Sequence, residues 1–288
     1  MTKFILLPLL VLLLMVAPGL AWYPRLKQEM LITPETTIVG HARDYIMAPD
    51  ETLMGLARHA GLGFDNLQRA NPGVDPWNPQ PGVRLTLPGA VLLPSDIRTG
   101  ITINLAELRL YLLWDEGRRR MVRIYPVGIG REGWDTPLGD YKVSVTIDKP
   151  VWTPPASVRA EKPELPAIVP PGPDNPLGDY WIALGADGLG IHGSNRPFGV
   201  GRRVSHGCIR LYPEDIADLV GRVGLGTRVR IIDQPVKHMV RNGILYLEVY
   251  RAVDPASSGF PVENWNRAVI ASTLQEARGV PVMIKAAR

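Results

Sequence analysis

Ser205-His206-Gly207-Cys208-Ile209-Arg210-Leu211 includes the only cysteine of this 288-residue chain. A lone thiol cannot form an intramolecular disulfide, so Cys208 is either a buried apolar side chain or a reactive group. His206 precedes it by two residues and His192 by sixteen, and a glycine adjoins each of these three side chains. Because a thiol reacts as its thiolate, it needs a base nearby. The pattern predicts a nucleophilic cysteine with a histidine base.

The residues around Cys208 suit acyl transfer if the segment is extended. In an extended chain His206 and Arg210 would lie on the same face as Cys208. Gly207 would let a substrate approach the backbone, and the N–H groups of Gly207 and Cys208 would be free to hold an oxyanion. The forked guanidinium of Arg210 is suited to a substrate carboxylate.

Two other interpretations of Cys208 stay open. The thiol could be inert and buried, although such a cysteine would not need histidine and glycine around it. Alternatively, His192, His206 and Cys208 could bind zinc, although no obvious fourth ligand accompanies them. The acyl-transfer chemistry predicted from these residues requires no metal and no cofactor.

The overall composition is that of a soluble globular protein. Hydrophobic residues make up 45% of the chain and charged residues 21%, which are ordinary values for this class. The formal net charge of +4 is small and the basic residues are scattered. No nucleic acid is therefore expected as a partner.

Residues 1–21 have the layout of a secretory signal peptide. Lys3 precedes an apolar run from Phe4 to Val16, and small residues lead to a cleavage position after Ala21. The alternative, a membrane anchor, is disfavoured because the run is shorter than the roughly 20 residues of a transmembrane helix. We expect export, with no stable membrane span after cleavage. An unpaired cysteine in an oxidising compartment is then expected to have a functional thiol.

Residues 43–89 are expected to form a small unit of their own. Apolar residues recur at helical spacing from Leu53 to Ala60, and a second short helix can begin at the cap residue Asp65. Strands are expected near 45 and over 83–87. The residues that match a known pattern are Asp50-Glu51-Thr52-Leu53, Leu67…Ala70-Asn71 and Pro81-Gly82. The unit resembles the LysM peptidoglycan-binding module, a small α+β domain; the alternative is a helical spacer.

Residues 98–233 are rich in predicted β-strands. Apolar residues alternate along 101–105 and 141–147. A hairpin over 180–192 would deliver His192 at its end. Pro213 opens a helix that Gly224 would cap. We expect this segment to be mainly β with a few helices.

Two further segments do not follow the alternating pattern of a β-rich domain. Nine prolines between Asp148 and Gly178 exclude regular structure there, and so long an insertion is expected to form a lid or wall over a cleft. Residues 234–288 contain one clear strand near 245–250 and a helix near 262–278. We expect them to be an appended extension rather than a further domain.

Several motifs occur together in one order. They are Thr136-Pro137-Leu138-Gly139, Trp152-Thr153-Pro154-Pro155, His192-Gly193-Ser194-Asn195-Arg196-Pro197, the Cys208 segment and Pro213-Glu214-Asp215. With these motifs, residues 98–233 resemble the L,D-transpeptidase (YkuD-like) family. The resemblance implies a catalytic β-sandwich or barrel with a few helices, and a periplasmic cysteine enzyme that acts on peptidoglycan.

The resemblance also implies a substrate, the tetrapeptide stem of peptidoglycan, and a mechanism. Cys208 would attack the carbonyl of the L-centre of meso-diaminopimelate and expel D-alanine, with His192 as general base. A carbonyl of Gly193 or Ser194 would hold the His192 tautomer. The thioester would then pass to an amine, either the diaminopimelate of another stem or a lysine of an outer-membrane lipoprotein.

The resemblance assigns roles to ten residues in this sequence. The catalytic residues would be Cys208, His192, Gly193, His206 and Gly207, and the substrate-binding residues would be Arg210, Ser205, Ser194, Asn195 and Arg196. Ser194 stands where the family more often has threonine. Two other functions remain open. Hydrolysis of the same thioester would make the chain an L,D-carboxypeptidase, and a wall-binding protein without activity would use the LysM-like unit alone.

Overall fold

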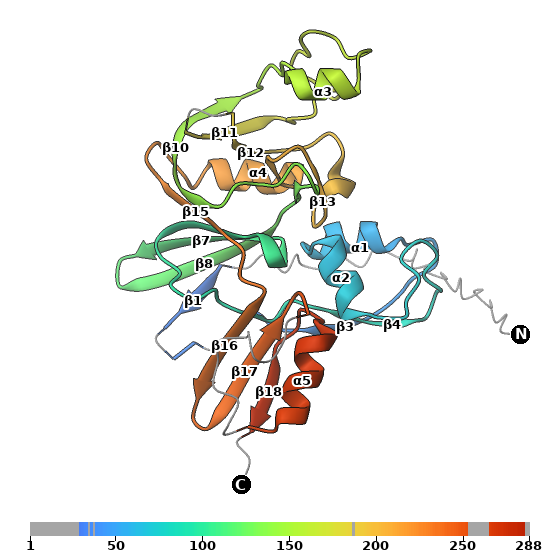
Figure 1. Ribbon diagram of the computed structural model, residues 1–288, viewed down its shortest axis with the longest axis vertical. Coiled ribbons are helices and arrows are strands. Elements are labelled where there is room, and N and C mark those ends of the chain that lie inside the picture. Colours follow the sequence, from blue (N-terminus) through green and yellow to red (C-terminus); the bar gives the residue numbers. More distant parts are fainter. Residues whose placement is uncertain (1–28, 34, 37, 186–187, 253–264, 286–288) are drawn as a thin grey trace, which may run out of the picture.

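Figure 1 shows the computed structural model, which describes residues 29–33, 35–36, 38–185, 188–252 and 265–285. The predicted signal peptide, residues 1–21, lies outside them. The strands of the larger unit are β1 (Met30–Ile32), β6 (Gly100–Asn104), β7 (Arg109–Glu116), β8 (Arg119–Pro126), β9 (Ile129–Gly130), β10 (Gly139–Asp148), β11 (Tyr180–Leu184), β12 (Gly190–His192), β13 (Arg203–Ser205), β14 (Ile209–Arg210) and β15 (Arg228–Ile232). The other strands are β2 (Ile38–Val39), β3 (Arg43–Ile46), β4 (Arg84–Leu87), β5 (Val91–Leu92), β16 (Val236–Arg241), β17 (Ile244–Val249) and β18 (Val282–Lys285). The helices are α1 (Leu53–Ala60), α2 (Phe64–Ala70), α3 (Ala156–Glu161), α4 (Pro213–Val220) and α5 (Arg267–Glu276), with 3-10 turns at Leu105–Glu107 and Pro197–Gly199.

Nine strands form one sheet in the order β1-β8-β7-β6-β15-β10-β11-β12-β14. Most neighbours are antiparallel, but β15 runs parallel to β6 and β14 runs parallel to β12. One face of the sheet carries a core of buried aliphatic side chains, which also includes Ile216 and Leu219 of α4. The prediction of a mainly β region with a few helices over 98–233 is confirmed. No described helix is long and apolar enough to span a membrane.

The face of this sheet opposite to the core is here called the outer face. A β-bulge in β10 changes which residues of that strand point to it. Val143 pairs with Leu184 of β11, but Val145 pairs with Ala183, so Ser144 is the extra residue. The Ser144 hydroxyl donates to Ala183 O at 3.3 Å. Because a bulge shifts the alternation by one residue, Val143 lies in the core whereas Val145 turns to the outer face.

Residues 43–89 contain β3, α1, α2 and β4, in the predicted strand, helix, helix, strand order. Thr52 caps α1, because its hydroxyl accepts a hydrogen bond from the Gly55 N–H at 3.0 Å. Gly61 ends the helix at φ 69°, where a residue with a Cβ would be strained. The unit has its own buried core, centred on Leu53, Leu67 and Leu85.

The second helix of this unit docks on the larger sheet. α2 begins at Phe64 and not after an Asp65 cap, so that prediction was wrong. The cause is a tertiary contact, since the Asp65 N–H, which has no partner within the helix, donates to Gly201 O at 3.1 Å. Asn66 Nδ2 donates to Glu107 O at 3.0 Å. These two hydrogen bonds fix the start of α2 to the loop before β13 and to the 3-10 turn at Leu105–Glu107.

The proline-rich segment 148–178 is more regular than expected. It contains the short helix α3 and an isolated bridge between Trp152 and Val169. The prediction of no regular structure was wrong because the prolines flank residues 156–161, and Pro155 stands before the first helical turn, where a missing N–H costs nothing. Asn175 Nδ2 donates to Pro150 O at 2.8 Å and so closes the segment at its base.

The helix that opens at Pro213 is shorter than predicted. It ends at Val220, and Gly221 follows as its cap in place of Gly224. Gly224 instead belongs to a tight turn in which its N–H donates to Thr227 Oγ1 at 3.0 Å. Gly224 does mark a chain reversal, but the helix ends three residues before it, at Gly221.

Residues after 235 form a unit with its own sheet and core. β16, β17 and β18 pair in that order and α5 covers one side, at the end of the molecule far from α3 (Figure 1). The sequence indicated only β17 and the helix, so two strands were missed. The predicted start of the helix at 262 falls outside the described residues, and the described helix begins at Arg267 after an Asn266 cap.

A buried ionic cluster joins this unit to the sheet. Lys237 Nζ of β16 lies 2.7 Å from Glu107 Oε2 and 3.1 Å from Glu248 Oε2. Arg109 contacts both carboxylates from the other side, at 3.3 and 3.4 Å. All four side chains are almost fully buried. Such groups are tolerated away from water only when each charge is paired, so the cluster fixes how the two units meet.

Candidate active site

Parallel pairing of β12 and β14 brings the two sequence motifs together. Ile191 pairs with Ile209, and His192 pairs with Arg210. Because both isoleucines point into the core, His192, Arg210 and Cys208 are directed to the outer face. There they border a cavity of about 370 Å³. Its other lining residues are Ile147, Pro150, Val151, Trp152, Thr153, Pro155, Val158, Pro176, Leu177, Trp181, Gly188, Ser205 and His206.

The proline-rich segment forms one side of this cavity. Trp152, Pro155 and Val158 all belong to it and line the space. The expectation that this insertion covers a cleft is confirmed. An apolar lining lowers the local dielectric and strengthens every electrostatic interaction at the thiol.

The Cys208 thiol is held by the backbone of the β11–β12 hairpin. Sγ lies 3.6 Å from Gly188 O, to which it donates. Burial raises the pKa of Cys208, and this is opposed by a hydrogen bond from the Gly190 N–H and by the charge of Arg210. The resting residue is therefore a neutral thiol near neutral pH, and a base must remove its proton before it can attack.

His192 is buried and uncharged. Its Nδ1 lies 2.6 Å from Gly193 O, one of the two carbonyls that the resemblance implied. Burial, and next the positive charge of Arg210, lower the pKa of His192 to about 3. Backbone hydrogen bonds of the ring with Gly193 and Leu177 oppose this shift. With Nδ1–H donating to Gly193 O, the lone pair of the neutral ring lies on Nε2. This is the tautomer that a general base needs.

His206 does not sit where an extended chain would put it. Gly207 has φ +103°, so the run breaks between β13 and β14, and the extended segment on which a shared face for His206 and Cys208 depended is not formed. The His206 ring packs edge-on to Trp134, with centroids 5.0 Å apart. Its Nε2 lies 3.1 Å from Glu161 Oε2 and 3.2 Å from Arg131 Nη2. His206 thus links the catalytic loop to α3.

The break at Gly207 leaves backbone donors open at the thiol. Neither the Gly207 nor the Cys208 N–H donates to another residue among those described. The Gly207 carbonyl is turned away and accepts from Thr136 Oγ1 at 2.8 Å. The two N–H groups therefore remain available for an oxyanion.

Arg210 borders the cavity, and no acidic residue among those that the structure describes forms an ion pair with it. Its Nε is buried and has no hydrogen-bond partner in the part of the chain that the structure describes. Burial lowers the pKa of Arg210, and Arg196 adds to this effect. Guanidinium groups stay charged in proteins, so an unpaired one in a cavity favours a carboxylate ligand.

The remaining predicted residues hold loops. Ser205 Oγ donates to Cys208 O at 2.5 Å, and so shapes the turn that presents the thiol. Ser194 Oγ accepts from the Arg196 N–H at 2.9 Å, and Asn195 Nδ2 donates to Asp174 O at 3.0 Å. Ser194, Asn195 and Arg196 do not line the cavity.

Four residues that border or support the site were not identified from the sequence. Trp181 stacks on His192, and Thr136 holds the Gly207 carbonyl. Arg131 and Glu161 hold His206. Two of them had a usable signal. The predicted hairpin over 180–192 makes Trp181 the cross-strand partner of His192, and Thr136 opens one of the motifs that carried the resemblance, although no role was assigned to it.

The geometry does not favour the alternative interpretation of His192, His206 and Cys208 as zinc ligands. Among the residues that the structure describes, no group of three His, Cys, Asp or Glu side chains could hold a metal ion. His206 is turned toward Glu161 and Arg131.

Comparison with known proteins identifies relatives of this chain. Residues 98–231 match the family model of the L,D-transpeptidase (YkuD) catalytic domain. The chain is similar to the probable L,D-transpeptidase YbiS of Escherichia coli (strain K12), with 40% identity over 226 residues that cover 76% of this chain and 73% of the relative. It is 44% identical over 225 residues to the probable L,D-transpeptidase YcfS of the same strain, covering 74% and 69%.

A solved structure, the catalytic domain of the E. faecium L,D-transpeptidase, aligns with a TM-score of 0.36 and 23% identity, over 48% of this chain and all of that one. The similarity to YbiS and YcfS extends well beyond the catalytic segment. This chain belongs to the YkuD family of L,D-transpeptidases.

Proposed function

We propose that the protein is a peptidoglycan L,D-transpeptidase in which Cys208 forms a thioester with a tetrapeptide stem. The observation that carries the proposal is the joint presence of Cys208, a neutral His192 and an unpaired Arg210 around one cavity. Peptidoglycan as substrate follows from membership of the family. In this proposal residues 1–21 direct export, and the enzyme works in the periplasm.

The first half-reaction consumes the stem. His192 Nε2 takes the proton of the Cys208 thiol as Sγ attacks the carbonyl carbon of the diaminopimelate L-centre. The N–H groups of Gly207 and Cys208 stabilise the negative oxygen of the tetrahedral intermediate. When the peptide bond breaks, His192 returns the proton to the leaving nitrogen, and D-alanine departs. A thioester on Sγ remains.

Arg210 is proposed to orient the stem. A guanidinium binds a carboxylate through two parallel hydrogen bonds, which fixes direction as well as position. Its charge also favours the thiolate, which opposes the effect of burial on the Cys208 pKa. The same residue thus binds the donor and promotes the attack.

The second half-reaction transfers the acyl group to an amine. The acceptor nitrogen attacks the thioester, gives up a proton to His192, and the Cys208 thiol is restored. Exclusion of water beneath the proline-rich segment favours the amine over hydrolysis. The acceptor is the diaminopimelate side chain of another stem or a lysine of an outer-membrane lipoprotein. Residues 43–89 would raise the local concentration of the polymer as a LysM-like module.

The test uses the mature protein and purified disaccharide-tetrapeptides. Mass spectrometry should show cross-linked dimers and free D-alanine, and a lipoprotein C-terminal peptide offered as a rival acceptor identifies the amine that is used. Cys208→Ala and His192→Gln should abolish product. His238→Gln, at a histidine outside the site, is the matched control. Product formation by Cys208→Ala would remove the proposal.

A second function shares every residue of the first. If water resolves the thioester, the products are a tripeptide and D-alanine, and the protein is an L,D-carboxypeptidase. The ratio of tripeptide to dimer, measured with and without added acceptor, separates the two. A protein that only binds the cell wall would release no D-alanine, and its thiol would resist acylation by a carbapenem.

A further inference from the structure

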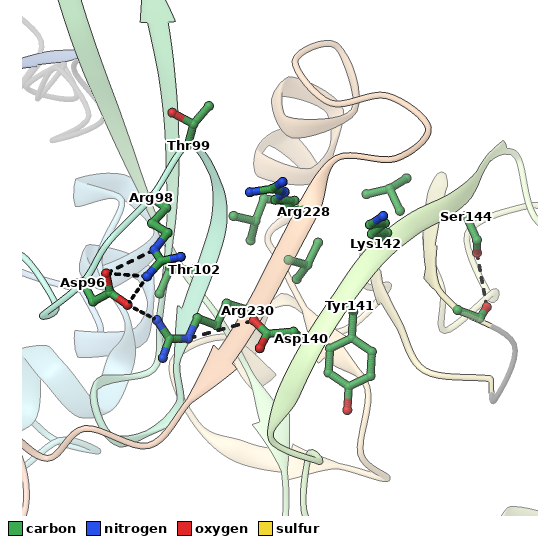
Figure 2. A pocket seen from close by; sticks show the side chains of 14 residues that line it. Asp96, Arg98, Thr99, Thr102, Asp140, Tyr141, Lys142, Ser144, Arg228 and Arg230 are labelled. Atoms are coloured by element: carbon green, nitrogen blue, oxygen red, sulfur yellow. Dashed lines mark hydrogen bonds and ion pairs between the residues drawn. The ribbon is translucent and has the colours of Figure 1, made fainter.

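A second hollow, of about 750 Å³, lies on the outer face of the nine-stranded sheet. Figure 2 shows it from close by, with β6, β15 and β10 beneath it and the segment that carries Asp96 and Arg98 beside it. It shares no lining residue with the Cys208 cavity. Its charged side chains are Asp96, Arg98, Asp140, Lys142, Arg228 and Arg230.

The two acids of this hollow are already paired. Asp96 accepts from Arg98 at 2.9 Å and from Arg230 at 3.0 Å, as the dashed lines of Figure 2 show. Arg230 also lies 4.0 Å from Asp140. Four cations against two anions leave an excess of two positive charges in the hollow.

This excess resides on Lys142 and Arg228. They are directly opposite each other on the antiparallel strands β10 and β15, and both are exposed. Neither forms an ion pair with any residue that the structure describes. Like charges at opposed positions destabilise a sheet. The next pair on the same face, Asp140 and Arg230, is of opposite charge, so the sheet itself does not require the repulsive arrangement.

The outer face connects this pair to the thiol. The bulge at Ser144 keeps Lys142, Val145 and Ile147 on one side of β10. Val145 and Ile147 are 46% and 41% exposed. Ile147 then lines the Cys208 cavity. An open strip of sheet surface therefore runs from the cation pair to the catalytic site.

We infer that Lys142 and Arg228 bind carboxylate groups of a peptidoglycan stem that neighbours the stem reacting at Cys208. The inference rests on the proposed function. Ile147 lies five positions after Lys142 along β10, which is roughly 17 Å of strand. The carboxylates beside the reacting bond are held in the Cys208 cavity, which shares no lining residue with the hollow, so a carboxylate bound by Lys142 and Arg228 is assigned to a neighbouring stem. The pair thus selects polymeric over small substrates.

Sedimentation with purified sacculi measures this binding. Lys142→Gln/Arg228→Gln should weaken the association of the mature protein by about threefold to thirtyfold, the range expected for two exposed charge contacts. Two controls accompany it. Arg118→Gln/Arg119→Gln removes the same charge from the β7–β8 turn, and Lys142→Arg/Arg228→Lys keeps the charge in place. Both controls should bind like the wild type. Equal binding by the Gln/Gln variant would overturn the inference.

The chemical identity of the ligand is tested separately. Sacculi whose stem carboxylates have been amidated should bind the wild type as weakly as the Gln/Gln variant binds untreated sacculi. Unchanged binding after amidation overturns the assignment to carboxylates. If polyphosphate displaces the protein from amidated sacculi, the ligand is a phosphate-rich polymer. That outcome also contradicts the assignment to carboxylates.

Turnover separates this inference from the proposed function. With soluble disaccharide-tetrapeptide the Gln/Gln variant should match the wild type, whereas its KM for sacculi should rise. A loss of activity on both substrates would mean that the pair supports the fold or the chemistry rather than polymer binding. If the wild-type protein turns over no tetrapeptide, the proposed function fails, and the binding measurement still decides the role of the pair.

Discussion

The indole of Trp181 lies stacked on the imidazole of His192, with ring centroids 5.7 Å apart and planes inclined by 23°. The two residues are cross-strand partners in the β11–β12 hairpin. Gly190 completes the arrangement, because a Cβ at that position would lie 2.4 Å from the Trp181 ring. The Gly190 N–H also contacts the Cys208 sulfur. The Trp181 indole therefore orients the plane of the His192 ring and also packs over Gly190, whose N–H contacts the Cys208 sulfur.

Trp181→Ala should lower kcat/KM by about 10- to 100-fold, because a base displaced by even an ångström loses its alignment with the thiol. Trp181→Phe, which keeps a stacked ring, should retain most of the activity. Release of D-alanine from tetrapeptide measures both. Trp77→Ala, at an exposed tryptophan in the N-terminal unit, is the control. Full activity in Trp181→Ala would show that hydrogen bonding to Gly193 alone orients His192.

The buried His192 makes stability depend on pH. Its pKa is lowered to about 3 in the folded protein, whereas an unfolded histidine has a pKa of about 6.5. Between these values the unfolded chain binds one more proton, so stability falls as the pH is lowered through that window, by about 1.4 kcal/mol per unit. Urea unfolding of wild type and His192→Gln at pH 7, 5 and 4 measures the difference. Parallel losses of stability in the two proteins would contradict the shift.

The ionic cluster at Lys237 should be sensitive to the loss of one partner. Lys237→Met keeps the length of the side chain but, among the described residues, leaves Glu107 and Glu248 with Arg109 as their one cationic partner. Leaving a buried charge uncompensated costs about 3 to 5 kcal/mol of unfolding free energy. Arg84→Met, which breaks an exposed ion pair with Asp44, should change stability by less than about 1 kcal/mol. Chemical denaturation compares the two, and equal effects would argue against a role for the cluster.

The same cluster shows why part of the fold could not be predicted. β16 alternates Val236, Lys237 and His238, and the inward position is taken by a lysine that is 1% exposed. An apolar pattern cannot reveal a strand whose buried residue is charged, since its partners Glu107 and Glu248 come from distant parts of the chain. β18 was missed for a different reason. It has only four residues, and it is defined by its pairing with β17.

The site was predictable where local sequence determines it. His192 lies at the end of a hairpin, and the glycines beside His192 and Cys208 indicate a backbone conformation that other residues rarely adopt. What could not be read was the bend at Gly207, whose φ of +103° turns His206 away from an extended path. The partners of His206 are equally remote: Glu161 lies on a helix between prolines, and Arg131 lies in a loop after β9. These contacts depend on tertiary packing.

The contact between Glu161 and His206 should control how well water is excluded. Together with Arg131, it ties α3 to the catalytic loop, and the hydrogen bonds from His206 and Arg131 hold the pKa of Glu161 below its usual range. Glu161→Ala should loosen α3 and shift products from cross-linked dimer toward tripeptide, with little change in total D-alanine release. Glu164→Ala, an exposed neighbour in the same segment, should leave the ratio unchanged. A constant ratio in Glu161→Ala would mean that α3 does not gate water.

Gly201 should be essential for docking the N-terminal unit, because a Cβ there would lie 2.3 Å from both Gly63 Cα and Phe64 N. Its φ of +75° is also a conformation that residues with a Cβ rarely adopt. Both partners of the clash are backbone, so it cannot be relieved by a rotamer change. Gly201→Ala should therefore separate residues 43–89 from the sheet and expose the 61–64 segment to protease. Gly226→Ala, at a positive φ with open space around it, isolates the cost of backbone strain. If both variants resist protease equally, the close approach at Gly201 is not required for docking, and the unit is held instead by its polar contacts with the larger unit, such as the Arg58–Glu214 ion pair and the hydrogen bond from Asn66 to Glu107.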